Sequence, residues 1–395
     1  MTKVAIREAE WIDPEAGEVA TGTVLVEDGC IAARLDGNER VSGDWEPVAR
    51  PGLRMAPGFV DLHFHGELVA TPPDHFAEAL ARDADRMLRE GTTAFLATSV
   101  CWPQASLGDT VEALARAADA LATGATCLGL HLEGPWISAD AAGAMATDAI
   151  RPFDARADAE VLARAGERLR MVTLAPEVAG ADALLAALVD RDVVAALGHT
   201  RASAQEIDAA VARGLRHVTH LWNAMGPLHH REPGVPGAVL ANDRLSADLI
   251  CDGHHVHPAV VRTTARTLGE RLMLITDRVE RPTQGAVASA LGEAEPDGVD
   301  GPWRRADGTL VGSSLGLDGA VRNLRRFAEA SLVEAIAACT SRPARLLGLE
   351  AERGTLRVGA RADFACLDET GRVMETWLGG SPVFHADPNE GAAPR

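Results

Sequence analysis

Short apolar runs alternate with amphipathic stretches through the middle of this 395-residue chain. Runs of strand type recur between about residues 57 and 276, and most are followed by a segment of helical period. A repeated strand–helix order predicts a parallel sheet, and eight repeats are the number that closes such a sheet into a barrel. The expected strands lie near 57–62, 93–98, 126–132, 170–174, 193–198, 216–221, 246–251 and 271–276. The expected helices include 75–90, 110–121, 181–190, 204–213 and 258–268.

The two ends of the chain differ from the middle. The first 55 residues contain short alternating segments with turns, and the tail from about residue 350 returns to strand-type sequence such as GTLRVGARADFACLD and VMETWLGG. Period-two alternation predicts half-buried strands. We therefore predict an α/β fold: a (β/α)8 TIM barrel over residues 56–349, beside a small β-sandwich domain built from residues 1–55 and 350–395.

Charge and composition exclude several classes of partner. The net charge of -19 argues against nucleic acid and anionic membranes, because negatively charged surfaces repel phosphate. No apolar run approaches the ~20 residues that span a bilayer, and the N-terminus MTKVAIREAEWID lacks the apolar core of a signal peptide. The six cysteines lie far apart without a C-x-x-C pair, so we expect neither a disulfide framework nor a zinc knuckle. These features predict a cytoplasmic protein.

Two residue types are almost or wholly absent. Lys3 is the only lysine, and the chain has no tyrosine. Schiff-base chemistry, a P-loop lysine and a carboxylated-lysine metal bridge are therefore practically excluded, as is a tyrosine acid. Any chemistry has to come from His, Asp, Glu, Cys, Ser and Arg.

Ligand-type side chains collect where the expected strands end. The stretch APGFVDLHFHG ends in two histidines that point to the same face, because strand residues alternate. The motifs HLEGP, LGHT, THLWN, CDGHHV and LITD follow other strands. Imidazoles and carboxylates at this end of a barrel suit a divalent ion, zinc first, with an open position for water. The residues concerned are His63, His65, Glu133, His199, His220, Asp252, His255 and Asp277.

The charges of these side chains suggest a chemical role for each of them. A single histidine after a strand is more often structural, but ligand-type residues at five strand ends favour a metal site. Glu133 is the anionic candidate to hold or bridge metal, and His199 and His220 complete a three-ligand site. Asp277 suits the base that takes a proton from water and returns it to a leaving amine. The alternative for Asp277 is a helix N-cap.

Two further stretches are candidates for substrate contacts. LWNAM places Asn223 and backbone amides after His220. HHREPG is a turn that presents Arg231, whose guanidinium is suited to a phosphate or carboxylate. Without further context, a surface arginine in a Pro/Gly turn is the more common interpretation of Arg231.

The motifs together resemble one known family. PGFVDLHFHG, HLEGPWIS, LGHT, THLWNAM, HREPG, DGHHV, LITD and GSSLGLDGAVRNL resemble, in order and spacing, the N-acetylglucosamine-6-phosphate deacetylases of the amidohydrolase superfamily. The resemblance covers nearly the whole chain and implies a metal-dependent deacetylase with one or two ions. It implies Glu133, His199 and His220 as ligands of the tight metal, with His63 and His65 as a second site. It implies Asp277 as the acid/base and Asn223, Ala224 and His255 as substrate contacts. It also implies a homodimer in which Arg231 reaches the sugar phosphate in the neighbouring subunit.

Three departures from the family pattern bear on the substrate. The family usually has a G-A-H or G-T-H triplet whose histidine polarises the amide carbonyl, whereas this chain has Gly143, Ala144 and Met145. A thioether cannot donate that hydrogen bond, and losing one such donor typically costs ~2.7–4 kcal/mol in kcat. The loop GELVATPPDHF replaces a Gly-rich loop, and Arg278 follows Asp277 where a small residue is usual.

Three functions stay open on the sequence. The leading one is hydrolysis of the N-acetyl amide of N-acetylglucosamine 6-phosphate. Met145 and Arg278 motivate an alternative, a related amidohydrolase that acts on another N-acyl amino sugar or amide in a specialised biosynthetic pathway. A non-catalytic binding protein on an inherited barrel is the third.

Overall fold

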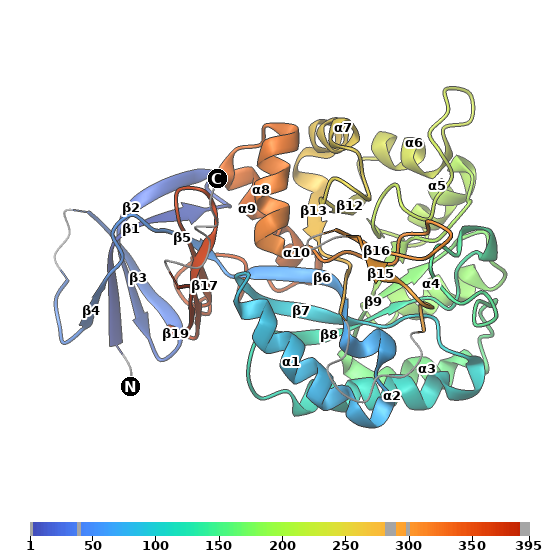
Figure 1. Cartoon of the computed structure of the whole chain (residues 1–395), viewed down its shortest axis with the longest axis horizontal. Coiled ribbons are helices and arrows are strands. Elements are labelled where there is room, and N and C mark those ends of the chain that lie inside the picture. Colours follow the sequence, from blue (N-terminus) through green and yellow to red (C-terminus); the bar gives the residue numbers. More distant parts are fainter. Residues whose placement is uncertain (1–2, 38–40, 281–289, 298–300, 388–395) are drawn as a thin grey trace.

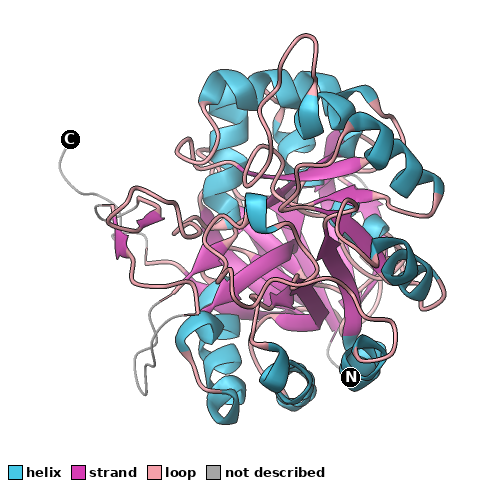
Figure 2. Ribbon diagram, turned by 90° about the vertical axis from the view of Figure 1, so that its right-hand side faces the viewer, coloured by secondary structure: helices cyan, strands magenta, loops and turns pink. Residues whose placement is uncertain are grey.

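The computed structural model describes residues 3–37, 41–280, 290–297 and 301–387. Its centre is a parallel sheet that is wrapped by helices, as Figure 2 shows. The strands follow the order β13-β12-β11-β10-β9-β8-β7-β6-β14, so that from β6 to β13 neighbours in sequence are neighbours in space, and β14 lies next to β6. The predicted TIM barrel is confirmed. Its strands are β6 (Phe59–Gly66), β7 (Thr92–Thr98), β8 (Thr126–Glu133), β9 (Leu169–Leu174), β10 (Val194–Leu197), β11 (His217–Val218), β12 (Ser246–Ile250), β13 (Leu272–Ile275) and β14 (Arg278–Val279).

Amphipathic helices cover the outside of the barrel. In the first helix, Phe76, Leu80 and Met87 share the buried face because their spacings of four and seven residues correspond to about one and two helical turns. The helix that starts after Ser203 has a capping box, in which the serine and Glu206 satisfy each other's backbone N–H groups. The helices are α1 (Phe76–Leu88), α2 (Gln104–Ala120), α3 (Asp158–Ala165), α4 (Ala181–Val189), α5 (Ala204–Ala212), α6 (Gly234–Ala241), α7 (Pro258–Leu268), α8 (Leu317–Ala328), α9 (Leu332–Ala337) and α10 (Ser341–Leu346). Short 3-10 turns are η1 (Glu67–Ala70), η2 (Pro73–His75), η3 (Ala139–Ala141), η4 (Gly166–Arg168) and η5 (Gly269–Arg271).

The barrel strands are buried on both faces. Every residue of β6 and β7 is buried, which explains why these strands read as continuous apolar runs rather than as alternation. Side chains such as Leu62, Met171 and Ile275 fill the interior of the barrel. The centre is therefore a packed core, and only the ends of the strands are available for a site.

Both ends of the chain join one mixed sheet beside the barrel (Figure 1). Strand β5, which leads directly into β6, pairs with β1 in parallel and with β17 in antiparallel register. The predicted second β-element from both ends is confirmed, while its exact boundaries stay a prediction. The strands are β1 (Lys3–Asp13), β2 (Glu18–Glu27), β3 (Cys30–Asp36), β4 (Glu46–Ala49), β5 (Arg54–Pro57), β17 (Phe364–Leu367), β18 (Val373–Leu378) and β19 (Ser381–His385). A separate hairpin pairs β15 (Glu295–Pro296) with β16 (Trp303–Arg304).

The barrel closes where its last strand meets its first. The amide of Asp277 donates a hydrogen bond to the carbonyl of His63 at 2.9 Å. Immediately afterwards, β14 pairs with β6 in parallel, with Arg278 opposite Phe64. Closure therefore brings the residues after β13 against the histidines of β6.

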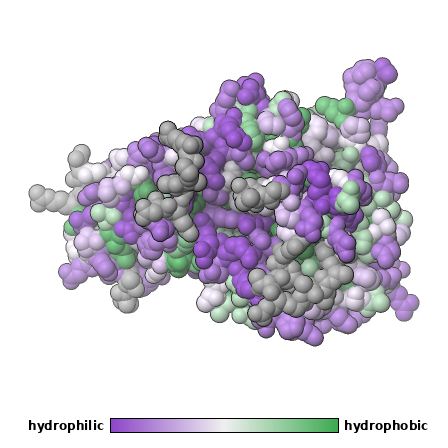
Figure 3. Space-filling model, in the orientation of Figure 1, coloured by the Kyte–Doolittle hydropathy of each residue, from purple (hydrophilic) through white to green (hydrophobic). Residues whose placement is uncertain are grey.

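The face of the molecule in Figure 3 is mainly hydrophilic, with scattered apolar residues. None of the helices in the described part of the chain combines the length and apolarity that crossing a bilayer requires. The exposed large apolar residues are Val19, Val189, Leu228, Val358 and Val383.

Candidate active site

A cavity of about 230 Å³ lies at the carboxyl ends of the barrel strands. Ten of the twelve predicted site residues line it. Of the five other lining residues, Gly143 belongs to the G-A-M triplet and Gly312 begins the GSSLGLDGAVRNL motif. The sequence reasoning did not single out Leu291, Thr309 and Leu310. The predicted ones are His65, Glu133, Ala144, Met145, His199, His220, Asn223, Ala224, His255 and Asp277, and the others are Gly143, Leu291, Thr309, Leu310 and Gly312.

Glu133, the last residue of β8, is the centre of the site. One of its carboxylate oxygens, Oε1, lies 3.0 Å from Nε2 of His199 and 2.9 Å from Nε2 of His220. These two imidazole nitrogens are 3.2 Å apart. Three strand ends thus bring three ligand-type atoms to one point.

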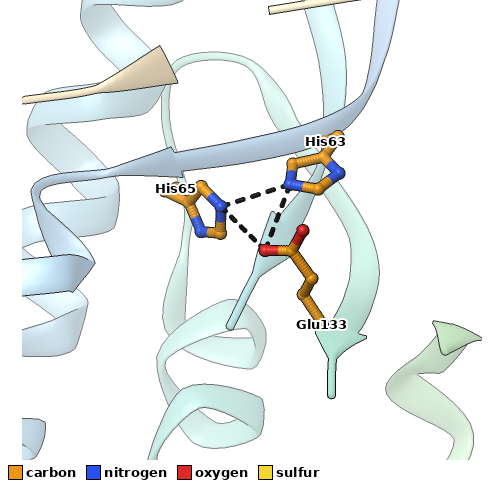
Figure 4. A group of neighbouring side chains, drawn as sticks. All are labelled: His63, His65 and Glu133. Atoms are coloured by element: carbon orange, nitrogen blue, oxygen red, sulfur yellow. Dashed lines mark hydrogen bonds and ion pairs between the residues drawn. The ribbon is translucent and has the colours of Figure 1, made fainter. Parts of the chain in front are cut away.

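The other carboxylate oxygen of Glu133 faces the two histidines of β6 (Figure 4). Oε2 lies 3.2 Å from Nε2 of His65 and 3.5 Å from Nε2 of His63. The two imidazole nitrogens are 3.2 Å apart. Glu133 therefore belongs to two groups whose ligand atoms all lie within 4.8 Å of one another, one with His63 and His65 and one with His199 and His220.

The hydrogen bonds made by the Nδ1 atoms show which nitrogen of each imidazole ring carries the proton. Nδ1 of His65 lies 3.2 Å from the carbonyl of Thr98, and Nδ1 of His199 lies 2.9 Å from the carbonyl of Ala141. A carbonyl only accepts, so Nδ1 holds the proton and Nε2 of the neutral ring presents a lone pair. Lone pairs of imidazoles and of Glu133 then face one another in a buried space, which is unfavourable unless a cation or protons lie between them.

The donor set fits a divalent metal. Oε2 of Glu133 is buried and has no hydrogen-bond partner among the described residues. Ligands at ~2.0–2.1 Å from a tetrahedral ion are roughly 3.3 Å from each other, which is close to the spacings of the His63–His65 and His199–His220 pairs. Imidazole together with carboxylate is a donor set that zinc and similar ions accept.

The carboxylates of the site favour positive charge on the neighbouring imidazoles. Burial would raise the pKa of Glu133, but the neighbouring histidines, led by His63, hold it well below its usual range. Burial would lower the pKa of the imidazoles, but Glu133 raises the pKa of His220 to about 9, and Asp277 with Glu133 raises the pKa of His65 to about 10. Burial also opposes the shift at Asp277, where His63 lowers the pKa to about 2.

Asp277 faces the histidines of β6 from the end of β13. Its Oδ1 lies 3.3 Å from Nε2 of His65 and 3.4 Å from Nε2 of His63. The preceding Thr276 donates its hydroxyl to the buried Asp61 at 2.6 Å, and Asp61 also accepts the amide of His63 at 3.2 Å. Asp61, in PGFVDLHFHG, was missed by the sequence reasoning, although a carboxylate inside an apolar strand was a signal for a buried polar clamp.

Several residues of the site have a left-handed backbone. The φ angles are 47° at His199, 33° at His220, 51° at Ala224 and 48° at Asp277. Residues with a Cβ rarely adopt this region, and such strain concentrates at functional sites. The turns after the strands aim these side chains inward at an energetic cost.

The remaining predicted contacts surround the same cavity. Nδ1 of His255 lies 2.6 Å from Asp252, whose other oxygen accepts two backbone N–H groups, so that the ring of His255 is fixed in the wall. The sulfur of Met145 accepts the amide of Cys101 at 3.5 Å. The side chain of Met145 is therefore anchored below the cavity and supplies no donor to it.

Two arginines lie outside the cavity lining. Arg231 is exposed in the segment between β11 and α6, which projects from the barrel in Figure 1. Arg278 forms ion pairs with Glu90 and Glu280. The side chain of Arg278 is directed into this ionic contact and does not line the cavity, and whether it alters the choice of substrate stays a prediction.

The amidohydrolase family model matches residues 54–385. The chain belongs to the amidohydrolase family. Within this family, it is 36% identical to the human N-acetylglucosamine-6-phosphate deacetylase over 349 residues, with 85% of each chain covered. It is 34% identical to the N-acetylgalactosamine-6-phosphate deacetylase of Escherichia coli O157:H7 over 380 residues, which covers 95% of this chain and 96% of the relative.

A solved structure gives the same assignment. The Mycobacterium smegmatis N-acetyl-D-glucosamine-6-phosphate deacetylase, an aspartate-to-alanine variant in complex with N-acetyl-D-glucosamine-6-phosphate, superimposes with a TM-score of 0.84 at 31% identity. The match covers 97% of this chain and 99% of that one. The predicted membership of the deacetylase family is confirmed, and the chain is an amide-hydrolysing enzyme.

Proposed function

We propose that the chain hydrolyses the N-acetyl amide of N-acetylglucosamine 6-phosphate to glucosamine 6-phosphate and acetate. The observation that carries this proposal is the convergence of Glu133 with two histidine pairs at one end of a cavity, with the carboxylate of Asp277 beside them. The similarity to deacetylases of two different 6-phosphorylated N-acetylhexosamines supports the substrate class.

The residues that would hold metal follow from the distances. Glu133, His199 and His220 form the tighter group, and His63 and His65 with the other oxygen of Glu133 form a second position. We propose zinc as the resident ion, in one or two copies, because the donors are nitrogen and carboxylate oxygen. A bound divalent cation polarises the amide carbonyl and makes water a stronger acid at neutral pH.

Asp277 moves the proton in this scheme. Its carboxylate stays ionised, because the histidines of β6 lower its pKa to about 2. It can therefore accept a proton from the attacking water and deliver that proton to the nitrogen of the leaving amine. The closing hydrogen bond from its amide to His63 holds it at the place where the water must lie.

The cavity is small enough to select a single sugar unit. Its volume of about 230 Å³ lies below the ~300–1,000 Å³ of drug-type pockets. Asn223, Ala224 and His255 are placed to contact the sugar. No arginine or lysine lines the cavity in the described part of the chain, so we propose that the phosphate is bound by Arg231 of a second copy in a homodimer, together with His255.

Met145 supports a second candidate substrate. The anchored thioether leaves the cavity without the usual side-chain donor to the amide carbonyl. An N-acyl amino sugar or related amide that is bound differently would not need this donor. A cytoplasmic location remains a prediction for either substrate.

A substrate panel tests the proposal. Purified, metal-loaded enzyme is assayed for amine release from N-acetylglucosamine 6-phosphate, N-acetylgalactosamine 6-phosphate and their unphosphorylated counterparts. We expect the highest kcat/KM for N-acetylglucosamine 6-phosphate. Equal turnover without the phosphate contradicts the proposed substrate and favours another N-acyl amino sugar.

A further inference from the structure

Arg278 connects to a buried ionic network beneath the active site. Its Nε lies 2.5 Å from Oε1 of Glu280, and its Nη1 contacts Glu90, which follows α1. The same oxygen of Glu280 lies 3.5 Å from Nη1 of Arg86 on α1. Arg278 thus joins the turn after Asp277 to the helix that follows β6.

The network continues to the turn after His65. The carboxylate of Glu67 is fully buried and lies 3.4 Å from Arg86 and 2.6 Å from Arg82. The amide of Glu67 donates to Asp83 at 2.9 Å. The turn requires glycine at this point, because Gly66 has φ +58° and a Cβ on it would lie 2.1 Å from the Asp83 carboxylate.

Backbone hydrogen bonds connect the same two turns. The amide of Glu280 donates to the carbonyl of Gly66 at 3.0 Å, and the amide of Asp277 donates to the carbonyl of His63 at 2.9 Å. The side chains of Arg278, Glu280 and Arg86 bridge these turns from outside the cavity. Two departures from the family pattern, the loop that contains Glu67 and the arginine after Asp277, therefore meet in one network.

We propose that Arg278 is a positioning residue for Asp277: through Glu280 and Arg86 it ties the turn after β13 to the turn after β6. This inference rests on the proposed function for its consequence on turnover. A catalytic group that moves by about 1 Å can lose 10²-fold in rate. Without the guanidinium, Glu90 and Glu280 share a largely buried space with no cation from Arg278, and repulsion between them displaces the turn.

Kinetics separate positioning from substrate binding. We expect Arg278→Met to lower kcat by about 10- to 100-fold, with KM changed by less than about threefold and metal content unchanged. Arg278→Lys keeps the charge and is expected to recover part of kcat. A KM that rises about tenfold with kcat intact overturns the proposal, since Arg278 then acts on substrate binding.

Arg353 provides a matched control. It is also a largely buried arginine, paired with Asp363 at 2.7 Å, and it does not line the cavity. Arg353→Met is expected to lower the melting temperature but to leave kcat within about twofold of wild type. Equal loss of kcat in both variants overturns the proposal, because the network is then only structural. If Arg278→Met does not fold, Glu280→Gln cuts the same connection at a partly exposed residue.

Hydrogen exchange gives a readout that needs no substrate. In both the metal-free and the metal-loaded protein, we expect the amides of residues 272–280 to exchange about tenfold faster in Arg278→Met than in wild type. In Arg353→Met, the exchange rates of the same amides are expected to equal those of wild type. Unchanged exchange in Arg278→Met overturns the proposal. If wild-type enzyme deacetylates no member of the panel, the proposed function fails, while this measurement still decides the role of Arg278.

Discussion

The Nε2 atom of His65 lies 3.3 Å from Oδ1 of Asp277, so an imidazole from the first barrel strand faces a carboxylate from the last. This contact exists because the barrel closes there, with the amide of Asp277 bonded to the carbonyl of His63. Asp277, the proposed acid/base, therefore lies beside the proposed metal ligands. It belongs to neither of the two ligand groups that share Glu133.

Asp277→Asn is expected to lower kcat by about 10²- to 10⁴-fold, because an amide cannot accept the proton from water. Metal content by elemental analysis should stay at the wild-type value, since the Glu133 groups are intact. Steady-state amine release measures the effect. Full activity in this variant removes Asp277 from the mechanism.

Metal stoichiometry is expected to depend on which histidine pair is altered. His199→Ala should remove the ion held with Glu133 and His220, and activity with it. His63→Ala should lower the metal content by no more than one ion per chain and leave the other group intact. Elemental analysis of both variants beside wild type measures this. Unchanged metal content in His199→Ala contradicts the ligand assignment.

The stability of the metal-free protein is expected to fall between about pH 7 and 10. The folded-state pKa values of His220 and His65, about 9 and about 10, lie above the usual 6.5. A raised pKa contributes stability that is fully present below pH 6.5 and is lost as the pH rises through the folded value. The metal-loaded protein should not show this loss, because the cation replaces the protons. Melting temperatures of both forms against pH test it, and parallel curves contradict it.

Arg231→Met is expected to raise KM for N-acetylglucosamine 6-phosphate by about tenfold or more, with little change in kcat, because the lost contact is to the phosphate. KM for an unphosphorylated analogue should not change. Arg191→Met is the control, since Arg191 is an exposed arginine whose side chain bonds only to the carbonyl of Ala187 among the contacts described. A monomer in sedimentation analysis with normal KM contradicts the role in a neighbouring subunit.

Met145→His is expected to change kcat for N-acetylglucosamine 6-phosphate by less than about threefold, if another donor already serves the carbonyl of that substrate. The Cys101 amide holds the present side chain beneath the cavity, and a histidine would lose this contact. A rise of about 100-fold indicates that a donor is missing and that the native substrate is a different amide.

The order of elements was predictable because buried parallel strands and amphipathic helices leave separate periods in the sequence. The expected strand near 126–132 corresponds to β8 at Thr126–Glu133, and the expected helix 258–268 to α7 at Pro258–Leu268. The ligand-type residues were predictable for the same reason, because the ends of parallel strands share one edge.

Contacts set by loop conformation were not predictable. Leu291 lines the cavity where Arg305 binds the carbonyls of Leu291 and Ala144, a contact between segments far apart in the chain. Arg278 was noted as a departure from the family pattern directly after Asp277, but its side chain lies in an ionic contact and does not line the cavity. Its partners are Glu280 and the distant Glu90, which follows α1, and no local pattern encodes the contact with Glu90.

The pairing of β5 with β17 constrains the order of events during synthesis. The strand that introduces His63 and His65 is preceded by one whose antiparallel neighbour is made more than 300 residues later. A nascent chain can complete the barrel while this edge still lacks its neighbour, and exposed strand edges are prone to pair with other chains. A segment made after the whole barrel thus protects the edge of the strand that leads into the first ligand strand.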